Sequence, residues 1–200
     1  STRIEAMVHA NEAYTSINPN NNPISKMLSI EALKFLGSSI KTAVFEGHNI
    51  NARSNMLFGS MLAGKAFANS PVAAVHALAY PIGGLFNISH GLSNSLVLPS
   101  VMKFNSINEE TKKNYANLAP YVFKDLDNSK SDEIVCNNFI DSLESLSKEL
   151  KLPYRLRDLQ IPEEACQLMA TEAMKQTRLL VNNPSKIEES DAFNIYKSVW

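Results

Sequence analysis

Residues 22–44, NPISKMLSIEALKFLGSSIKTAV, decide the fold class of this 200-residue chain. Asn22 followed by Pro23 is a favourable helix start, because proline is pre-set for the first helical position. From there the large apolar residues recur at steps of three and four, which gives one broad helical face: Met27, Leu28, Ile30, Leu33, Phe35, Leu36, Ile40 and Val44. The stretch therefore predicts a long helix with one buried face.

The rest of the chain repeats this helical pattern, and no segment alternates with a period of two. Helices are expected at residues 4–14, 51–69, 72–79, 91–104, 108–118, 131–150, 162–180 and 188–199. The prolines between these segments are expected to end or separate helices: Pro81, Pro120, Pro153, Pro162 and Pro184. With no strand pattern and no internal repeat, the sequence predicts an all-α, multi-helix bundle.

Composition and charge are those of an ordinary globular chain. The apolar content is 44% and the charged content 20%, and 200 residues can bury a sizeable core. A net charge of −1 gives no electrostatic case for nucleic acid or an anionic membrane as a partner. No apolar stretch approaches the roughly 18–20 residues that span a bilayer, and no leader is evident, so we expect a cytoplasmic protein. Cys136 and Cys166 have neither disulfide-type nor metal-type spacing and are predicted to be buried, reduced thiols.

The chain lacks the glycine-rich loops that bind nucleotide phosphates. It contains no G-x-G-x-x-G and no Walker loop, and its seven glycines lie in or beside helical segments. We therefore expect no site for a nucleotide diphosphate in this chain alone. Residues 1–5 enter a helical pattern at once. Because the ends of a chain fray, a natural protein is not expected to begin in this way, so we expect the chain to be one domain of a longer protein.

Three histidines and one carboxylate have the spacing of metal ligands. Glu5 and His9 are four residues apart, so a helix places them on one face with their Cβ atoms roughly 5–6 Å apart. His76 and His90 bracket a run with a proline and two glycines, which can end one helix and bring the chain back past the same point. Three imidazoles and one carboxylate suit zinc or ferrous iron, with room for a substrate oxygen.

The spacing alone leaves a second interpretation open. A Glu and a His four residues apart are also common on solvated helix faces, so the motif is only a hypothesis without its structural context. His48 provides the contrast, because it lies in a polar, turn-like stretch without a partner. We predict that His48 is a loop histidine.

Motifs over the first half of the chain occur in an order and at a spacing typical of one enzyme family. They are IEAMVHANEAY (4–14), NPIS (22–25), AR (52–53), residues 56–69, VHALAYPIGG (75–84), HGLSN (90–94) and LP (98–99). These motifs resemble the C-terminal, helical domain of the iron-containing alcohol dehydrogenase family. The second half resembles the family in its helical character and in ending where the family ends.

The resemblance implies a dehydroquinate-synthase-like, two-domain enzyme in which residues 1–200 form the C-terminal metal-binding domain. The N-terminal domain, absent from this chain, binds NAD(P) through its own glycine-rich turn. Such enzymes interconvert an alcohol and an aldehyde or ketone, by metal polarisation of the oxygen and hydride transfer with NAD(P). We therefore expect a fragment that acts on a small alcohol or aldehyde only together with its cofactor domain. The alternative is a metal-free helical module that keeps the fold for packing or assembly. Homo-oligomer formation stays open.

The resemblance also assigns the ligands. The family holds its metal, usually iron(II) and sometimes zinc, with one aspartate and three histidines, and these match Glu5, His9, His76 and His90. Glu5 departs from the family's aspartate. Its extra methylene moves the carboxylate by more than the roughly 0.5 Å to which a functional constellation must be held. Three outcomes stay open: adaptation through a rotamer change or bidentate binding, preference for another metal, or a weak site.

Two aromatic residues are assigned roles in the same way. Tyr80 follows His76 by one helical turn and is expected beside the site, where its phenol would orient substrate or a water molecule. Many relatives have histidine there, which leaves a proton-relay role open. Phe67 matches a position that lines the substrate pocket in similar enzymes, and the alternative is a core phenylalanine.

Overall fold

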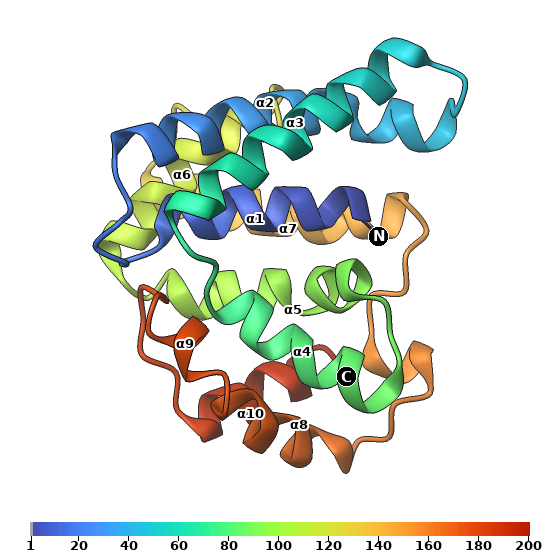
Figure 1. The fold of residues 1–200 in the computed structure, drawn as a ribbon, viewed down its shortest axis with the longest axis vertical. Coiled ribbons are helices and arrows are strands. Elements are labelled where there is room, and N and C mark those ends of the chain that lie inside the picture. The colour runs from blue at the N-terminus through green and yellow to red at the C-terminus, as the bar shows by residue number, and fades with distance from the viewer. Residues whose placement is uncertain (1) are drawn as a thin grey trace.

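In a computed structural model the chain is all-α, and the backbone is described for residues 2–200 and the side chains for residues 4–200. Within this range the chain forms ten α-helices, one 3₁₀-helix and no β-strand, which confirms the predicted fold class (Figure 1). The elements are α1 (Thr2–Thr15), α2 (Pro23–Phe45), α3 (Ile50–Asn69), α4 (Ala74–Phe86), α5 (His90–Asn105), α6 (Glu109–Val122), α7 (Asp132–Glu149), η1 (Leu156–Leu159), α8 (Ala165–Met174), α9 (Thr177–Leu180) and α10 (Glu189–Ser198).

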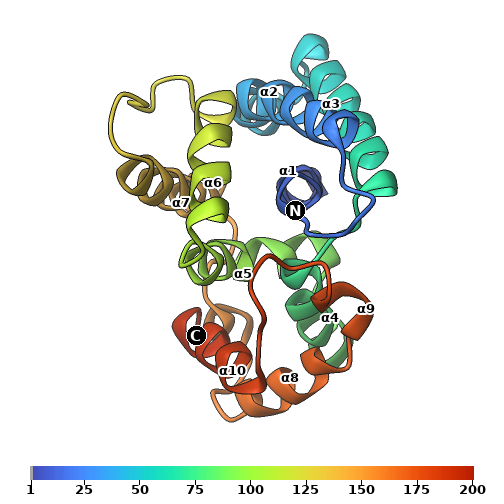
Figure 2. The same ribbon diagram turned by 90° about the vertical axis from the view of Figure 1, so that its left-hand side faces the viewer.

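Helix α1 lies at the centre of the bundle. Figure 2 views it end-on, with α2 and α3 on one side and α5 and α6 on others, and all four of these helices contact it. Nearly every described residue of α1 is buried, including Met7, Val8 and Ala10. A helix that is buried all round must be covered by several elements at once. Helix α4 lies below α1 in Figure 1 and packs against α5, α8 and α9.

The predicted start of α2 is confirmed. The side-chain oxygen of Asn22 accepts hydrogen bonds from the N–H groups of Ile24 and Ser25, and the Ser25 hydroxyl accepts one from the Asn22 N–H. This reciprocal capping satisfies backbone donors that a helix end otherwise leaves unpaired. Pro23 occupies the first helical position, as expected.

Two prolines do not end helices, contrary to the prediction. Pro81 lies inside α4 and Pro120 inside α6. Each removes one helical donor, but Pro81 is buried in a helix packed on three others, and this burial holds the helix together across the defect. Helix α4 instead ends at Phe86, and the capping residue Asn87 has a left-handed φ of 54°, a conformation that asparagine tolerates better than most residues.

The prediction of a single helix over residues 162–180 is also wrong. The chain forms α8 and then the short α9, with a break at Lys175 and Gln176. There the N–H groups of Lys175 and Gln176 bond to Glu172 and Ala173, three residues back, so the last turn of α8 tightens and ends. The helices expected over 131–150 and 188–199 are confirmed as α7 and α10.

His48 and the two cysteines lie as predicted. His48 is exposed in the turn between α2 and α3. Cys136 and Cys166 are both free and buried. No helix in residues 2–200 combines the length and apolarity that a membrane crossing needs.

The thiol of Cys136 is expected to be unreactive in the folded chain. Burial raises its pKa to about 11 from an ordinary 9.0, so at pH 8 the reactive thiolate is about 100-fold scarcer than in the unfolded chain. Alkylation followed by peptide mass spectrometry, which separates Cys136 from Cys166, should show labelling slower by about that factor in buffer than in guanidinium. Equal rates in the two solvents would contradict the burial of this thiol.

Candidate metal centre

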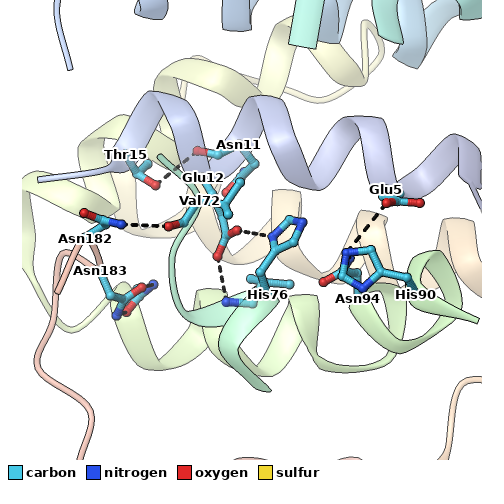
Figure 3. A network of polar contacts seen from close by, with 12 residues as sticks. Glu5, Asn11, Glu12, Thr15, Val72, His76, His90, Asn94, Asn182 and Asn183 are labelled. Carbon is cyan, nitrogen blue, oxygen red and sulfur yellow. Dashed lines mark hydrogen bonds and ion pairs between the residues drawn. The ribbon is translucent and has the colours of Figure 1, made fainter. Parts of the chain in front are cut away.

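Three helices bring the predicted ligands together. Helix α1 carries Glu5 and His9, α4 carries His76, and α5 begins at His90. The ring centres of His9 and His76 are 4.8 Å apart, and those of His76 and His90 are 5.2 Å apart. Glu5 Oε1 lies 3.7 Å from His90 Nε2, and Figure 3 shows these two side chains facing each other. The four predicted residues therefore form one cluster.

The loop between α4 and α5 produces this convergence. The sequence prediction that the chain returns past the same point is confirmed, although the return begins at Asn87 rather than at Pro81. Only residues 87–89 separate the two helices, which pack against each other. A Cβ on Gly83 would meet the Ile88 carbonyl at 3.2 Å, so the small residue allows the loop to fold back closely on α4.

A second carboxylate, to which the sequence analysis gave no role, contacts the centre. Glu12 lies on α1 with only 4% of its surface exposed. Its Oε2 is 2.5 Å from His76 Nδ1, and its Oε1 accepts a 2.6 Å hydrogen bond from the Val75 N–H (Figure 3). The sequence carries a signal that could have identified Glu12: residues 5, 9 and 12 follow the i, i+4, i+7 spacing of one helix face.

The surroundings keep the imidazoles of His9 and His90 uncharged. Burial is the largest cause that lowers the pKa of His9 to about 3, and the nearby His76 and His90 lower it further. The pKa of His90 is also lowered, first by burial and then by His76, against the opposing effect of Glu5 and Glu12. A neutral imidazole is the form that binds metal ions, so the site is suited to a cation at neutral pH.

The described residues are of the types that bind metal ions, but their side chains are not oriented to hold one. Within residues 2–200, no set of three or more His, Cys, Asp or Glu side chains could hold an ion as it lies. The His9 and His76 rings are stacked at 12°, and the Asn94 amide nitrogen contacts His90 Nε2 at 3.2 Å. Because ring nitrogens bind ions in the plane of the ring, the partly exposed rings of His9 and His90 would have to rotate.

One orphaned atom favours a cation here. His76 Nε2 is fully buried and has no hydrogen-bond partner in the part of the chain that the structure describes. Buried polar atoms are nearly always satisfied, so such an atom in a native structure calls for an unseen partner. Together with the nitrogen and carboxylate donors around it, this atom fits iron(II) or zinc, and the ligand assignment stays a prediction.

Both predicted aromatic residues border the cluster. The Tyr80 ring lies 5.5 Å from that of His90. Phe67 stacks on His9 with ring centres 4.6 Å apart, and 37% of its surface is exposed. Phe67 is therefore not the core residue that the alternative required, whereas its role in a substrate pocket remains a prediction.

The family model and the similar sequences all point to one enzyme family. The sequence model described as "Fe-containing alcohol dehydrogenase family, C-terminal" matches residues 1–200. The long-chain-alcohol dehydrogenase 1 of Geobacillus thermodenitrificans is 37% identical over the whole chain, which covers 49% of that protein. The 1,3-propanediol dehydrogenase of Citrobacter freundii is 32% identical, with 50% of its length covered. The chain thus spans about half the length of the curated relatives that it matches.

Solved structures of similar enzymes have the same helical fold as this chain. The whole chain superposes on a 1,3-propanediol oxidoreductase with a TM-score of 0.92 and 31% identity, covering 50% of that chain. It superposes equally well on an alcohol dehydrogenase from Oenococcus oeni, with a TM-score of 0.92, 32% identity and 51% of that chain covered. In each case the helical fold is matched over its full length.

Proposed function

Because the chain belongs to the Fe-containing alcohol dehydrogenase family, as its C-terminal domain, we propose that it is the metal-binding half of an NAD(P)-dependent alcohol dehydrogenase. The observation that carries this proposal is the convergence of Glu5, His9, His76 and His90 from three helices around His76 Nε2, which has no partner among the residues that the structure describes. An N-terminal domain outside this chain would bind NAD(P), and the present chain alone would be inactive.

The proposed ligands are Glu5, His9, His76 and His90, with iron(II) as the expected ion and zinc as the second choice. When bound there, the ion supplies Lewis-acid polarisation of the substrate oxygen, while NAD(P) exchanges a hydride with the adjacent carbon. The lowered pKa values of His9 and His90 favour their neutral rings at pH 7, so each keeps one ring nitrogen whose lone pair is available to an ion.

The chain's other residues would orient the substrate. Phe67 covers one face of His9 and exposes apolar surface, so it would contact the carbon chain of an alcohol and exclude water from it. Tyr80 lies beside His90, where its phenol would orient the substrate or a water molecule. The relatives' names include a long-chain alcohol, 1,3-propanediol and 4-hydroxybutyrate, so we propose the class of alcohol and aldehyde substrates without choosing among them.

An anaerobic iron(II) titration tests the proposed metal site. We expect one equivalent to bind to the 200-residue chain, because one cluster of three imidazoles and one carboxylate is present. The matched control is His48→Ala, which removes an exposed turn histidine and should leave one equivalent bound. A wild-type chain that binds neither iron(II) nor zinc would support the alternative of a metal-free helical module.

Activity requires a separate experiment. The chain can be fused to the N-terminal half of the Geobacillus relative, with the relative's own two halves rejoined as the positive control. We expect alcohol-dependent NAD(P)H formation by the fusion and none by the chain alone. A fusion that binds iron and NAD(P) but oxidises no alcohol would contradict the proposed dehydrogenase function.

A further inference from the structure

We propose that Glu12 is a positioning residue that sets the tautomer and orientation of His76, directing the free Nε2 of that ring into the metal centre. The role in metal binding rests on the proposed function. The effect on the ring itself does not, because it follows from contacts within the chain.

The Glu12 carboxylate contacts the first turn of α4 through both of its oxygens. Both of its oxygens face nitrogen atoms of α4: Oε1 accepts from the Val75 N–H at 2.6 Å, and Oε2 lies 2.5 Å from His76 Nδ1. Glu12 and His76 are 4% and 2% exposed, so water does not compete for these contacts. A hydrogen bond to a buried carboxylate is stronger than one between neutral groups.

The contact with Glu12 decides which nitrogen of the His76 ring carries the proton. An ionised carboxylate only accepts hydrogen bonds, so His76 Nδ1 must carry a hydrogen toward Glu12 Oε2. A second proton on Nε2 would be a buried donor with no acceptor, since that atom has no partner among the described residues. The neutral ring with its hydrogen on Nδ1 therefore remains, and its lone pair lies on Nε2.

Glu12 also links α1 to the beginning of α4. Ala73, the residue before α4, supplies no side-chain cap, so the Glu12 bond to Val75 satisfies a backbone donor in the first turn of α4. The same carboxylate thus fixes both the backbone and the ring of one proposed ligand helix. Because Glu12 lies on α1 with Glu5 and His9, it sets α4 relative to two further proposed ligands.

Glu12→Gln separates the bond to the Val75 backbone from the control of the His76 tautomer, with little change in the shape of the side chain. The amide has one donor group and one acceptor group, whereas the site offers two N–H donors. If its oxygen keeps the Val75 bond, its NH₂ faces His76 Nδ1, and the ring hydrogen must move to Nε2. That hydrogen would occupy the atom proposed to bind the metal.

The test uses two measurements on the whole 200-residue chain. Imidazole ¹⁵N NMR of the metal-free wild type should show His76 protonated on Nδ1, and Glu12→Gln should move the proton to Nε2. Zinc titration against a competing chelator should then show affinity reduced about 10- to 100-fold, as is typical when a residue that orients a ligand is removed.

Tyr196→Phe is the matched control. It also removes one buried hydrogen bond to α4, between the Tyr196 hydroxyl and the Leu78 carbonyl, but it does not touch the imidazole. We expect unchanged tautomer and zinc affinity for this variant. An equal loss of affinity in Tyr196→Phe and Glu12→Gln would overturn the positioning role, because stability of α4 alone would then explain both.

The wild-type spectrum decides the inference even if Glu12→Gln fails to fold. A His76 ring protonated on Nε2 in the wild type would overturn it, as would a folded Glu12→Gln chain with unchanged tautomer. A wild type that binds neither zinc nor iron(II), with its proton on Nδ1, would count against the proposed function and leave the effect of Glu12 on the ring supported.

Discussion

His76→Ala is expected to remove metal binding, from one equivalent in the wild type to less than about 0.1 at micromolar ion concentration. His76 stands between the other two histidines, 4.8 Å from His9 and 5.2 Å from His90 by ring centre, and supplies the buried donor Nε2. Losing a direct ligand should cost more than the about 100-fold associated with an outer partner. Elemental analysis measures the bound equivalents, and chelator competition measures the affinity.

Folding is the necessary check on this result. The alanine leaves a cavity and removes the partner of Glu12 Oε2, and both changes destabilise a buried site. His76→Gln retains an amide donor for Glu12 and should fold better while still losing the ion. His48→Ala should keep both fold and metal. Full metal binding by a folded His76→Ala or His76→Gln chain would show that the histidine cluster is not the site.

Gly37→Ala is expected to destabilise the chain by about 1–3 kcal/mol, the usual range for overpacking a close contact. A Cβ at this position of α2 would lie 2.5 Å from the Val122 carbonyl oxygen and 2.8 Å from the Val122 Cα. Both atoms belong to the backbone of α6, so no side-chain rotation can relieve the clash. The two helices would have to separate, and urea unfolding should show a lower midpoint.

Gly64→Ala provides the opposite result from the same chemical change. Apart from its chain neighbours and the nearby backbone of α3, a Cβ on Gly64 would meet no atom of the described residues within 4 Å. Alanine there should stabilise the chain by about 0.5–1 kcal/mol, because it forms helix more readily than glycine. A Gly37→Ala chain as stable as Gly64→Ala would mean that α2 and α6 do not pack as closely as the structure shows.

Sequence reasoning succeeded for helices whose signals are local. The cap at Asn22 and Pro23 acts within four residues, so it could be recognised without knowing the fold. Pro81 misled because its effect depends on packing: a buried helix held by α5, α8 and α9 tolerates a missing bond. The break between α8 and α9 was missed because neither glycine nor proline marks Lys175 or Gln176.

The same distinction applies to the site. Glu5 and His9 are neighbours on one helix, and the short return after Asn87 brings His90 back to His76, so sequence spacing predicted the cluster. Glu12 was missed because its partner, His76, lies 64 residues away in the sequence. Only the folded structure, in which the Glu12 side chain meets the first turn of α4, shows why a carboxylate is placed there.

The central position of α1 also affects how the chain folds. During synthesis α1 leaves the ribosome before the four helices that enclose it, and the last of these ends at Val122. Its apolar surface therefore stays exposed until more than half of the 200 residues have been made. Contacts between distant segments form slowly, so the nascent chain passes through a stage in which α1 is open to aggregation or to a chaperone.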